Sequence, residues 1–296
     1  MKIDVTQRAA LSRLFSPTVF RDLAQKGRSP LFARLLLETP LLRNDIDLSS
    51  TVSSSFEAAF SILQQSGIRD EYIFRSAITK NILLGKHSLK TASMLTEFRA
   101  GLCKADIVIL NGTSTVYEIK SDRDSLSRLS NQISNYQKVF GSVYVIAGKS
   151  HVNEVYNNTS SEVGVMELVA RGRIRTIRKA IDCSDRVCST AIFESLRIEE
   201  ARQILNNIGA DIVDVPNIAL RSTMRDCFRK IEPKLAHDQM VKVLKKTRNL
   251  APLSDFIFRL PVSLQAAGLS FQIRKADHQR LISTINTPLD VAITWT

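Results

Sequence analysis

Two short apolar segments joined by an Asn-Gly pair constrain the fold of this chain more than any other feature. Lys104-Ala-Asp-Ile-Val-Ile-Leu110 and Val116-Tyr-Glu-Ile-Lys120 are rich in β-branched residues. Asn111-Gly112 lies between them and is typical of a tight hairpin turn. The pattern therefore predicts two antiparallel strands that are neighbours in one sheet.

Both predicted strands carry ionisable side chains, namely Asp106, Glu118 and Lys120. Burying such groups costs free energy unless each charge has a partner or a metal. Side chains alternate between faces, so Glu118 and Lys120 share one face, and Asp106 joins them only if the loop has an odd number of residues. We expect a three-residue loop of Leu110, Asn111 and Gly112, or an equivalent bulge, because a two-residue turn would send Asp106 to the opposite face.

Asp106 followed by Glu118-Ile119-Lys120 resembles the signature of the PD-(D/E)XK nuclease superfamily, in which an acidic residue on one strand precedes Glu-x-Lys on the next. In that superfamily a helix, a three-strand meander, a helix and a strand follow one another, and residues 70–148 fit this order. The chain departs from the pattern at Ala105, which stands where the superfamily name has proline.

The run from Tyr117 to Leu129, followed by Gln132 and Tyr136, resembles an uncharacterised bacterial branch of this superfamily that is often found in prophage-like settings. The resemblance extends over most of the chain. It implies an α/β (α+β) fold, with a restriction-endonuclease-like core of a mixed β-sheet flanked by helices and with helical N- and C-terminal extensions. We predict a helical N-terminal arm at 1–60, the nuclease-like core at 61–180 and a basic, mainly helical region at 181–296.

A helix is predicted over residues 70–84, where Phe74, Ile78 and other apolar residues recur at helical spacing, and it is expected to end at Gly85. Glu71 lies seven residues before Ile78 and should therefore point inward as well. Superfamily members often have an extra acidic residue on this helix, which makes Glu71 a candidate metal ligand. Glu97, on the predicted strand Met94–Ala100, is the alternative, and the sequence leaves the choice open.

A second helix is predicted after Lys120 from an apolar stripe with spacings of three and four residues: Leu126, Leu129, Ile133, Tyr136 and Phe140. Ser121 or Asp122 could cap this helix, and Arg128 could pair with Asp124 or Gln132 on its surface. The resemblance implies that Gln132 lies near the active site, where Gln132 and Arg128 could contact nucleic acid. Tyr136 is expected to pack in the core. Gly141–Gly148 then predicts a buried strand.

Basic residues are concentrated in the C-terminal part of a chain whose net charge is +12. Residues 171–296 contain 21 Lys and Arg against 13 Asp and Glu, whereas residues 1–170 contain 20 against 16. Val163–Val169 and Arg173–Lys179 predict a hairpin around Gly172. Arg171, Arg173 and Arg175 would share one face of its second strand and could contact phosphates. The basic clusters at 221–230 and 242–248 are weaker candidates for the same role.

Other patterns exclude several classes of protein. A run of eighteen apolar residues and an N-terminal apolar leader are both missing, which predicts a cytoplasmic protein without membrane association. The four cysteines show no Cys-x-x-Cys spacing, which argues against a structural zinc site. Gly85-Lys86 lacks the remainder of a phosphate-binding loop. Helices are predicted in the first 60 residues and through most of residues 188–284.

These observations predict a metal-dependent nuclease that hydrolyses phosphodiester bonds, with DNA favoured over RNA, in phage defence or a mobile element. Asp106, Glu118 and the carbonyl of Ile119 would hold Mg²⁺, with Mn²⁺ as a substitute, and Lys120 would position water or offset developing charge. A homodimer would be needed for concerted cutting of a duplex by single active sites. The alternative is a catalytically silent module on the same fold that binds nucleic acid or protein.

Overall fold

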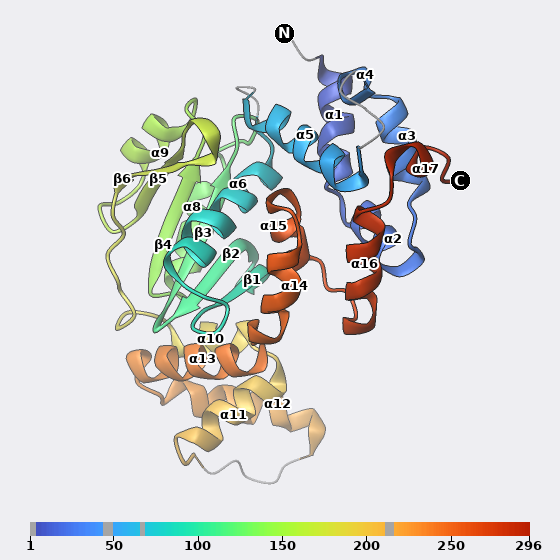
Figure 1. Ribbon diagram of the computed structural model, residues 1–296. Helices are drawn as coiled ribbons and strands as arrows, with labels where there is room; N and C mark the ends of the chain where they lie inside the picture. Colours follow the sequence, from blue (N-terminus) through green and yellow to red (C-terminus); the bar gives the residue numbers. More distant parts are fainter. Residues whose placement is uncertain (1–3, 44–49, 66–68, 211–215) are drawn as a thin grey trace. The chain divides into compact units, whose positions relative to one another are not determined.

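The computed structural model describes residues 4–43, 50–65, 69–210 and 216–296. The chain divides into two compact units. Figure 1 draws the ribbon in colours that follow the sequence. Unit 1 comprises Met1–Ile82, Val169–Arg173 and Leu253–Thr296, and unit 2 comprises Leu83–Leu168 and Ile174–Pro252. The compact units therefore do not follow the consecutive segments divided at residues 60 and 180, because the N- and C-terminal parts of the chain pack within one unit.

Unit 2 is built on a mixed six-stranded sheet whose strands follow one another in sequence order across the sheet. The strands are β1 (Ser93–Ala100), β2 (Cys103–Asn111), β3 (Thr113–Lys120), β4 (Ser142–Ala147), β5 (Gly164–Leu168) and β6 (Ile174–Arg178). Strands β1, β2 and β3 form an antiparallel meander, β4 runs parallel to both β3 and β5, and β6 returns antiparallel to β5. The expected fold class is thereby confirmed as a mixed sheet flanked by helices.

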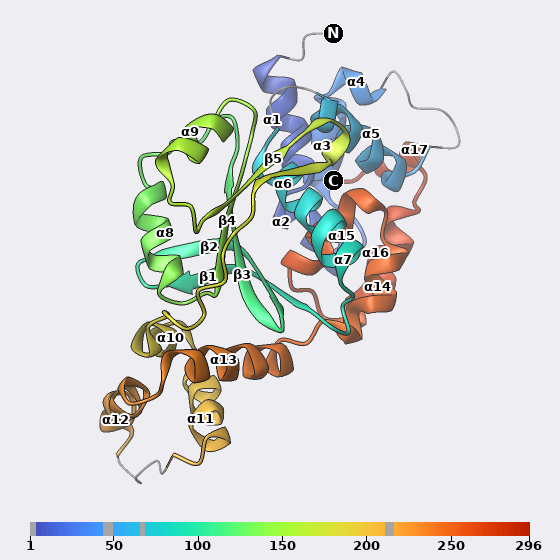
Figure 2. The ribbon, with the colours of Figure 1, turned by 90° about the vertical axis from the view of Figure 1, so that its left-hand side faces the viewer.

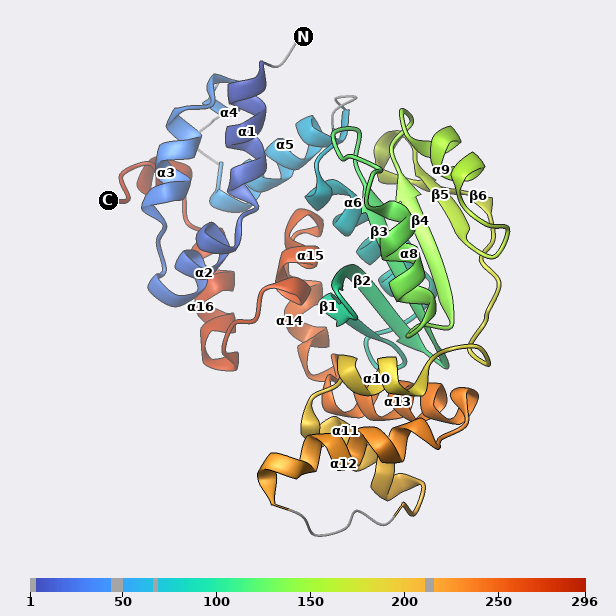
Figure 3. The same ribbon diagram turned by 180° about the vertical axis from the view of Figure 1, so that it is seen from behind.

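Helices cover the sheet on one face and at one end. Helices α8 (Leu129–Gln137) and α9 (Val152–Asn158) lie against the same face (Figure 2). At the end of the sheet lie α10 (Ser189–Ser195) and α13 (Pro233–Thr247), with α11 (Ile198–Asn207) and α12 (Asn217–Arg229) packed on them (Figure 3). One continuous apolar core runs from the strands through α8 to these four helices. The prediction of helices in residues 188–284 is confirmed.

The loop between β2 and β3 has the expected odd length. Asn111 pairs with Thr113 across the two strands, so Gly112 alone lies between the paired positions. The expected three-residue loop of Leu110, Asn111 and Gly112 is therefore not observed, because Leu110 and Asn111 belong to β2, but the parity that places Asp106 on the face of Glu118 is kept. Gly112 has a φ of 73°, a left-handed conformation that costs glycine little because it has no Cβ.

Helix α13 is attached to this hairpin by a buried chain of hydrogen bonds. The N–H of Gly141 donates to Ser114 Oγ at 3.0 Å, and Ser114 Oγ lies 2.8 Å from His237 Nε2. Because the Asp238 carboxylate can only accept, His237 Nδ1 donates to Asp238 Oδ1 at 3.0 Å, and Nε2 of the neutral ring is left to accept from the Ser114 hydroxyl. Ser114 and His237 are both fully buried, so this Ser-His-Asp arrangement fixes a helix and offers no nucleophile to a substrate.

Two predicted helices differ from the observed ones. Helix α6 (Glu71–Ile78) continues into a π-helical turn, η1 (Thr79–Leu83), and then into α7 (Leu84–Lys86). The prediction that Gly85 ends this helix is wrong: the helix continues to Lys86, and His87, whose Nδ1 lies 2.7 Å from Asn111 Nδ2, follows in an extended conformation.

Helix α8 begins at Leu129, later than the apolar stripe predicted. Neither Ser121 nor Asp122 caps it, because the carboxylate of Asp124 accepts the N–H of Ser121 at 2.7 Å, and Asp122 accepts hydrogen bonds from Ser150. These bonds hold residues 121–128 in a turn, so Leu126 packs on the core from outside the helix.

Unit 1 is helical among its described residues. Its N-terminal helices are α1 (Val5–Leu14), α2 (Pro17–Lys26), α3 (Pro30–Leu37), α4 (Pro40–Arg43), α5 (Val52–Gln65) and α6. Its C-terminal helices are α14 (Ser254–Arg259), α15 (Val262–Ser270), α16 (His278–Ile285) and α17 (Leu289–Ala292). Helix α16 packs on α2, and α15 packs on α5 and α6. The helical N-terminal region is confirmed.

None of the described helices combines the length and the apolar character needed to cross a membrane. The four cysteines are free thiols.

Candidate functional site

Strands β2 and β3 separate at Asp106, and this separation organises the site. Their regular pairing ends with Ile107 opposite Tyr117, so the next positions along the two strands are Asp106 and Glu118. The half-buried carboxylate of Asp106 accepts the N–H of Ile119 at 2.7 Å through Oδ2. Asp106 thus replaces a ladder hydrogen bond and is fixed beside the backbone between Glu118 and Lys120.

Glu118 and Lys120 form a buried ion pair on β3. Lys120 Nζ lies 3.0 Å from Glu118 Oε1, and the two side chains are only 6% and 2% exposed. Burial raises the pKa of Glu118, while the Lys120 ammonium and the hydrogen bonds from Tyr136, Lys120 and Gln132 oppose that shift. The expectation that Glu118 and Lys120 share a face is met.

Two residues of α8 complete this buried group. Gln132 Oε1 accepts from Lys120 Nζ at 2.8 Å, and Gln132 Nε2 donates to Glu118 Oε1. Tyr136 Oη lies 2.7 Å from Glu118 Oε2 and 2.9 Å from the carbonyl oxygen of Lys104. Burial, reinforced by the charges of Glu118 and Asp106, raises the pKa of Tyr136, so its hydroxyl stays protonated and donates.

Gln132 therefore contacts two of the candidate site residues, whereas the hydrogen bond of Tyr136 to Glu118 was not predicted. Tyr136 is fully buried, as its position in the apolar stripe predicts, but it also holds the Glu118 carboxylate. A buried tyrosine hydroxyl usually finds a hydrogen-bond partner. Its spacing of four residues from Gln132 on one helix face was the signal that could have identified it.

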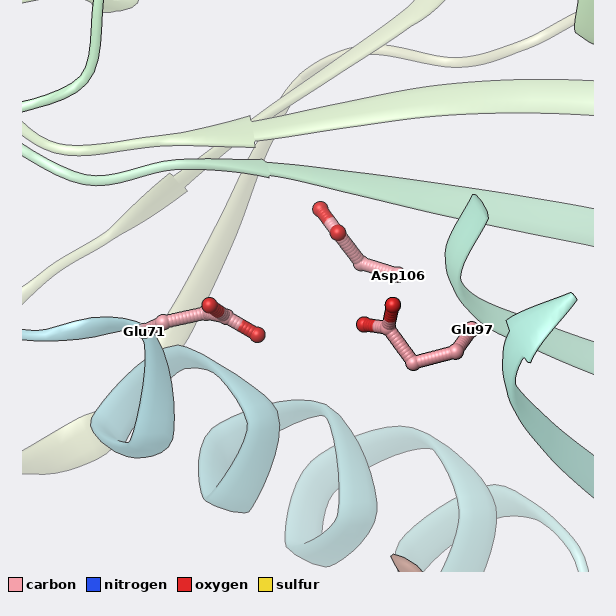
Figure 4. A group of neighbouring side chains, drawn as sticks. All are labelled: Glu71, Glu97 and Asp106. Atoms are coloured by element: carbon pink, nitrogen blue, oxygen red, sulfur yellow. The ribbon is translucent and has the colours of Figure 1, made fainter. Parts of the chain in front are cut away.

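Glu97 adds a second carboxylate near Asp106. It occupies the position on β1 opposite Asp106, where the regular pairing of β1 and β2 is interrupted, and its φ is 53°. A left-handed conformation is uncommon for a residue with a long side chain. One carboxylate oxygen of Glu97 lies within 4.8 Å of one of Asp106. Figure 4 shows the Glu97 carboxylate beside the Asp106 side chain. The distorted backbone thus directs an exposed acid toward a half-buried one.

Glu71, the other candidate ligand, belongs to unit 1 and is also drawn in Figure 4. It lies in the first turn of α6, with a side chain that is 53% exposed and pairs with Arg75 one turn later. The expectation that Glu71 points inward with Ile78 is therefore wrong. Asp70 caps this helix by accepting the N–H of Ile73, so Glu71 is its first residue, where a carboxylate is favoured by the helix dipole. A role for Glu71 as a metal ligand remains a prediction.

The arginines predicted to bind nucleic acid are not arranged as expected. Arg128 is exposed at the start of α8. Arg171 lies in the 3-10 turn η2 (Ala170–Gly172) with a φ of 59°, and Arg173 follows that turn, so only Arg175 is within β6. The prediction that Arg171, Arg173 and Arg175 share a strand face is therefore wrong, because the hairpin turn includes Arg171. Arg175 pairs with Glu167 across the hairpin.

The chain is similar to phage proteins. A family described as bacteriophage P4 protein cII matches residues 64–257. Protein cII of Enterobacteria phage P4 is 31% identical over 163 residues, which cover 53% of this chain and 59% of that protein. The chain thus spans less than two thirds of the curated relative. A solved structure of a protein of unknown function from Silicibacter pomeroyi has 16% identity and a TM-score of 0.28, over 42% of this chain and 86% of that one.

Proposed function

The chain belongs to the bacteriophage P4 protein cII family, and from this premise and the geometry of β2 and β3 we propose that it is a metal-dependent nuclease. The proposed reaction is hydrolysis of phosphodiester bonds in nucleic acid, with DNA favoured over RNA. The similarity to a phage protein supports a role in a prophage or another mobile element. A role in phage defence and a homodimeric state are further proposals.

One observation carries this proposal. Where β2 and β3 separate, Asp106 is fixed by the N–H of Ile119, and the residues on both sides of that N–H are the paired Glu118 and Lys120. A protein gains little stability from a buried ion pair compared with apolar residues of similar volume. Two acids and a lysine at one strand separation, held by Gln132 and Tyr136, are therefore more readily explained by chemistry than by folding.

The donor atoms fit a hard divalent cation. Mg²⁺ takes oxygen ligands, usually one or two carboxylates together with water and phosphate. Asp106 and Glu97 provide carboxylate oxygens within 4.8 Å of each other. In this proposal Glu118 and the carbonyl of Ile119 would be the further donors on β3, with Glu118 exchanging a side-chain partner for the ion. When bound, such an ion lowers the pKa of a water ligand and offsets negative charge on the phosphate.

The protein's own groups have separate tasks in this proposal. Lys120 is a cation held in place by Glu118 and Gln132, so it can stabilise charge that develops on a phosphate without first reorganising. Gln132 and Tyr136 keep the Glu118 carboxylate in one orientation. The N–H of Ile119 does the same for Asp106.

Cleavage assays with matched variants test the proposal. Purified protein is incubated with plasmid DNA and with structured RNA, in Mg²⁺, in Mn²⁺ and in chelator. We expect cleavage only with metal, its loss in Asp106→Asn and Lys120→Met, and its retention in Lys104→Gln, which removes an exposed lysine from the neighbouring strand. Absence of cleavage of every substrate by the folded wild-type protein contradicts the proposal.

One observation favours the second candidate, a catalytically silent binding module. Both carboxylate oxygens of Glu118 already have side-chain partners, so the buried group is complete as a structural element. A silent module should bind nucleic acid or protein with equal affinity in buffer with Mg²⁺ and in buffer with chelator. It should cleave neither the plasmid DNA nor the structured RNA. Binding without cleavage therefore selects this candidate.

A further inference from the structure

The outer face of α13 carries a row of lysines that the proposed active site does not use. The inner face of this helix is buried and includes His237, Met240 and Leu244. Lys234, Lys242 and Lys246 are exposed on the other side, together with Asp238, at intervals of four residues. Four residues of α-helix rise by about 6 Å and turn slightly more than once around the axis, so these side chains form a row that winds slowly along the helix. We call Lys234, Lys242 and Lys246 the lysine stripe.

The stripe has a net positive charge that its own surroundings do not cancel. Asp238, the acid within the row, pairs with Lys234 and His237. Among the residues that the structure describes, neither Lys242 nor Lys246 has an ion-pair partner. Nearby arginines differ in this respect, since Arg221 and Arg225 both pair with Glu194 and Arg248 pairs with Glu200.

Folding explains only part of this arrangement. Cations near a helix C-terminus are favoured by the helix dipole, but that effect falls off within the last turn. It accounts for Lys245 and Lys246 and not for Lys242, which lies further inside the helix. Like charges at a separation of four residues, as at Lys242 and Lys246, weaken a helix slightly. An exposed row of uncompensated lysines on a rigid helix is instead complementary to a line of phosphates.

We propose that the lysine stripe of α13 binds the sugar-phosphate backbone of nucleic acid. The inference deepens the proposed function and rests on it for the identity of the bound polymer as substrate. The position of α13 supports this proposal. The hydrogen bond between His237 and Ser114 attaches the helix to the β2–β3 hairpin, whose strands carry Asp106 and Glu118. A nucleic acid held by the stripe is thereby held by the same unit as the candidate active site.

Salt-dependent binding of DNA to the full chain tests this proposal in chelator, where cleavage plays no part. Each phosphate neutralised contributes about 0.9 to the slope of log K against log salt for duplex DNA and about 0.7 for single strands. We therefore expect Lys242→Gln/Lys246→Gln to reduce the slope by about 1.8 on duplex or about 1.4 on single strands. Lys242→Arg/Lys246→Arg should keep the wild-type slope.

The matched control is Lys90→Gln/Lys179→Gln, which removes two exposed lysines elsewhere in unit 2 and should leave the slope unchanged. A second measurement needs no variant: bound DNA should protect Lys242 and Lys246 from acylation in the wild-type chain and leave Lys90 and Lys179 reactive. Unchanged slope in the glutamine variant, unprotected stripe lysines, or binding to anionic vesicles without binding to DNA would overturn the proposal. Lack of cleavage with intact binding refutes only the nuclease activity.

Discussion

Replacing Lys120 by methionine probes the buried ion pair directly, because methionine keeps much of the side-chain volume and removes the charge. The change leaves the Glu118 carboxylate buried, with Tyr136 and Gln132 as its remaining partners. Removing one member of a buried ion pair typically costs about 3–5 kcal/mol. We expect a loss of this size in the free energy of unfolding of unit 2 at neutral pH.

The cost should depend on pH through Glu118. Burial raises the pKa of this carboxyl, and Lys120 is the largest influence opposing that shift, so Lys120→Met raises the pKa further. A group whose pKa is higher in the folded state favours folding below its ordinary pKa, and this contribution is lost as the pH rises. The destabilisation by Lys120→Met should therefore be greatest at neutral pH and should shrink as the pH falls toward 4.5, the ordinary value for a glutamate.

Hydrogen exchange of peptides from β3 and α8 measures this effect locally. A loss of about 3–5 kcal/mol accelerates exchange through opening of unit 2 by roughly 150- to 5,000-fold. Trp295, the one tryptophan of the chain, lies in unit 1, and its fluorescence serves as an internal control that should change little. Glu118→Gln/Lys120→Met should recover much of the loss, since it leaves no buried charge.

Three results would refute this reasoning. The first is a destabilisation by Lys120→Met below about 1 kcal/mol, the upper range for exposed ion pairs. The second is a cost that does not change with pH. The third is a loss of unfolding free energy in Glu118→Gln/Lys120→Met that is larger than the losses of the two single variants added together. In that case an uncompensated buried charge would not be the cause.

Three further predictions concern other parts of unit 2. Tyr136→Phe should lower the free energy of unfolding by about 1.5–3 kcal/mol, the usual value for a hydrogen bond to a charged group, as measured by chemical denaturation. If the chain cleaves nucleic acid, the same change should lower kcat more than KM in cleavage kinetics. Wild-type stability should fall as the pH drops below 6.5, because burial lowers the pKa of His237 and its protonation removes the acceptor for Ser114; Ser114→Ala should weaken this pH dependence in thermal melts. Gly164→Ala should destabilise by about 1–3 kcal/mol, since a Cβ there would lie 2.3 Å from the Tyr144 ring; an unchanged Tm would contradict the packing.

Periodicity in the sequence was sufficient to predict the elements around the site. Alternating β-branched residues and the Asn-Gly pair predicted β2 and β3 with an odd loop, and the apolar stripe ending at Phe140 predicted most of α8. These signals are local, because side-chain spacing within a strand or helix reports which face packs inward. The order of a helix, three strands, a helix and a strand over residues 70–148 was instead implied by the resemblance to the PD-(D/E)XK superfamily.

The sequence could not show how separate elements meet. The contact of Tyr136 with Glu118 joins residues of a helix and a strand, and Glu97, which has a left-handed backbone, lies opposite Asp106 of the neighbouring strand. Arg171 shows the opposite kind of failure. The alternating pattern of the predicted strand was extended back to Arg171, which lies in a turn. Likewise, no local pattern indicates that the two ends of the chain pack within one unit.

The sequence by itself determined which ionisable side chains the two adjoining strands carry: two acids and a lysine. Tertiary structure alone decided their state, because it pairs Glu118 with Lys120, gives Asp106 the N–H of Ile119 and buries Tyr136 against the carboxylate. The physical reason is that pairing and burial depend on contacts between elements distant in the chain, whereas strand and helix patterns depend on residues close in sequence.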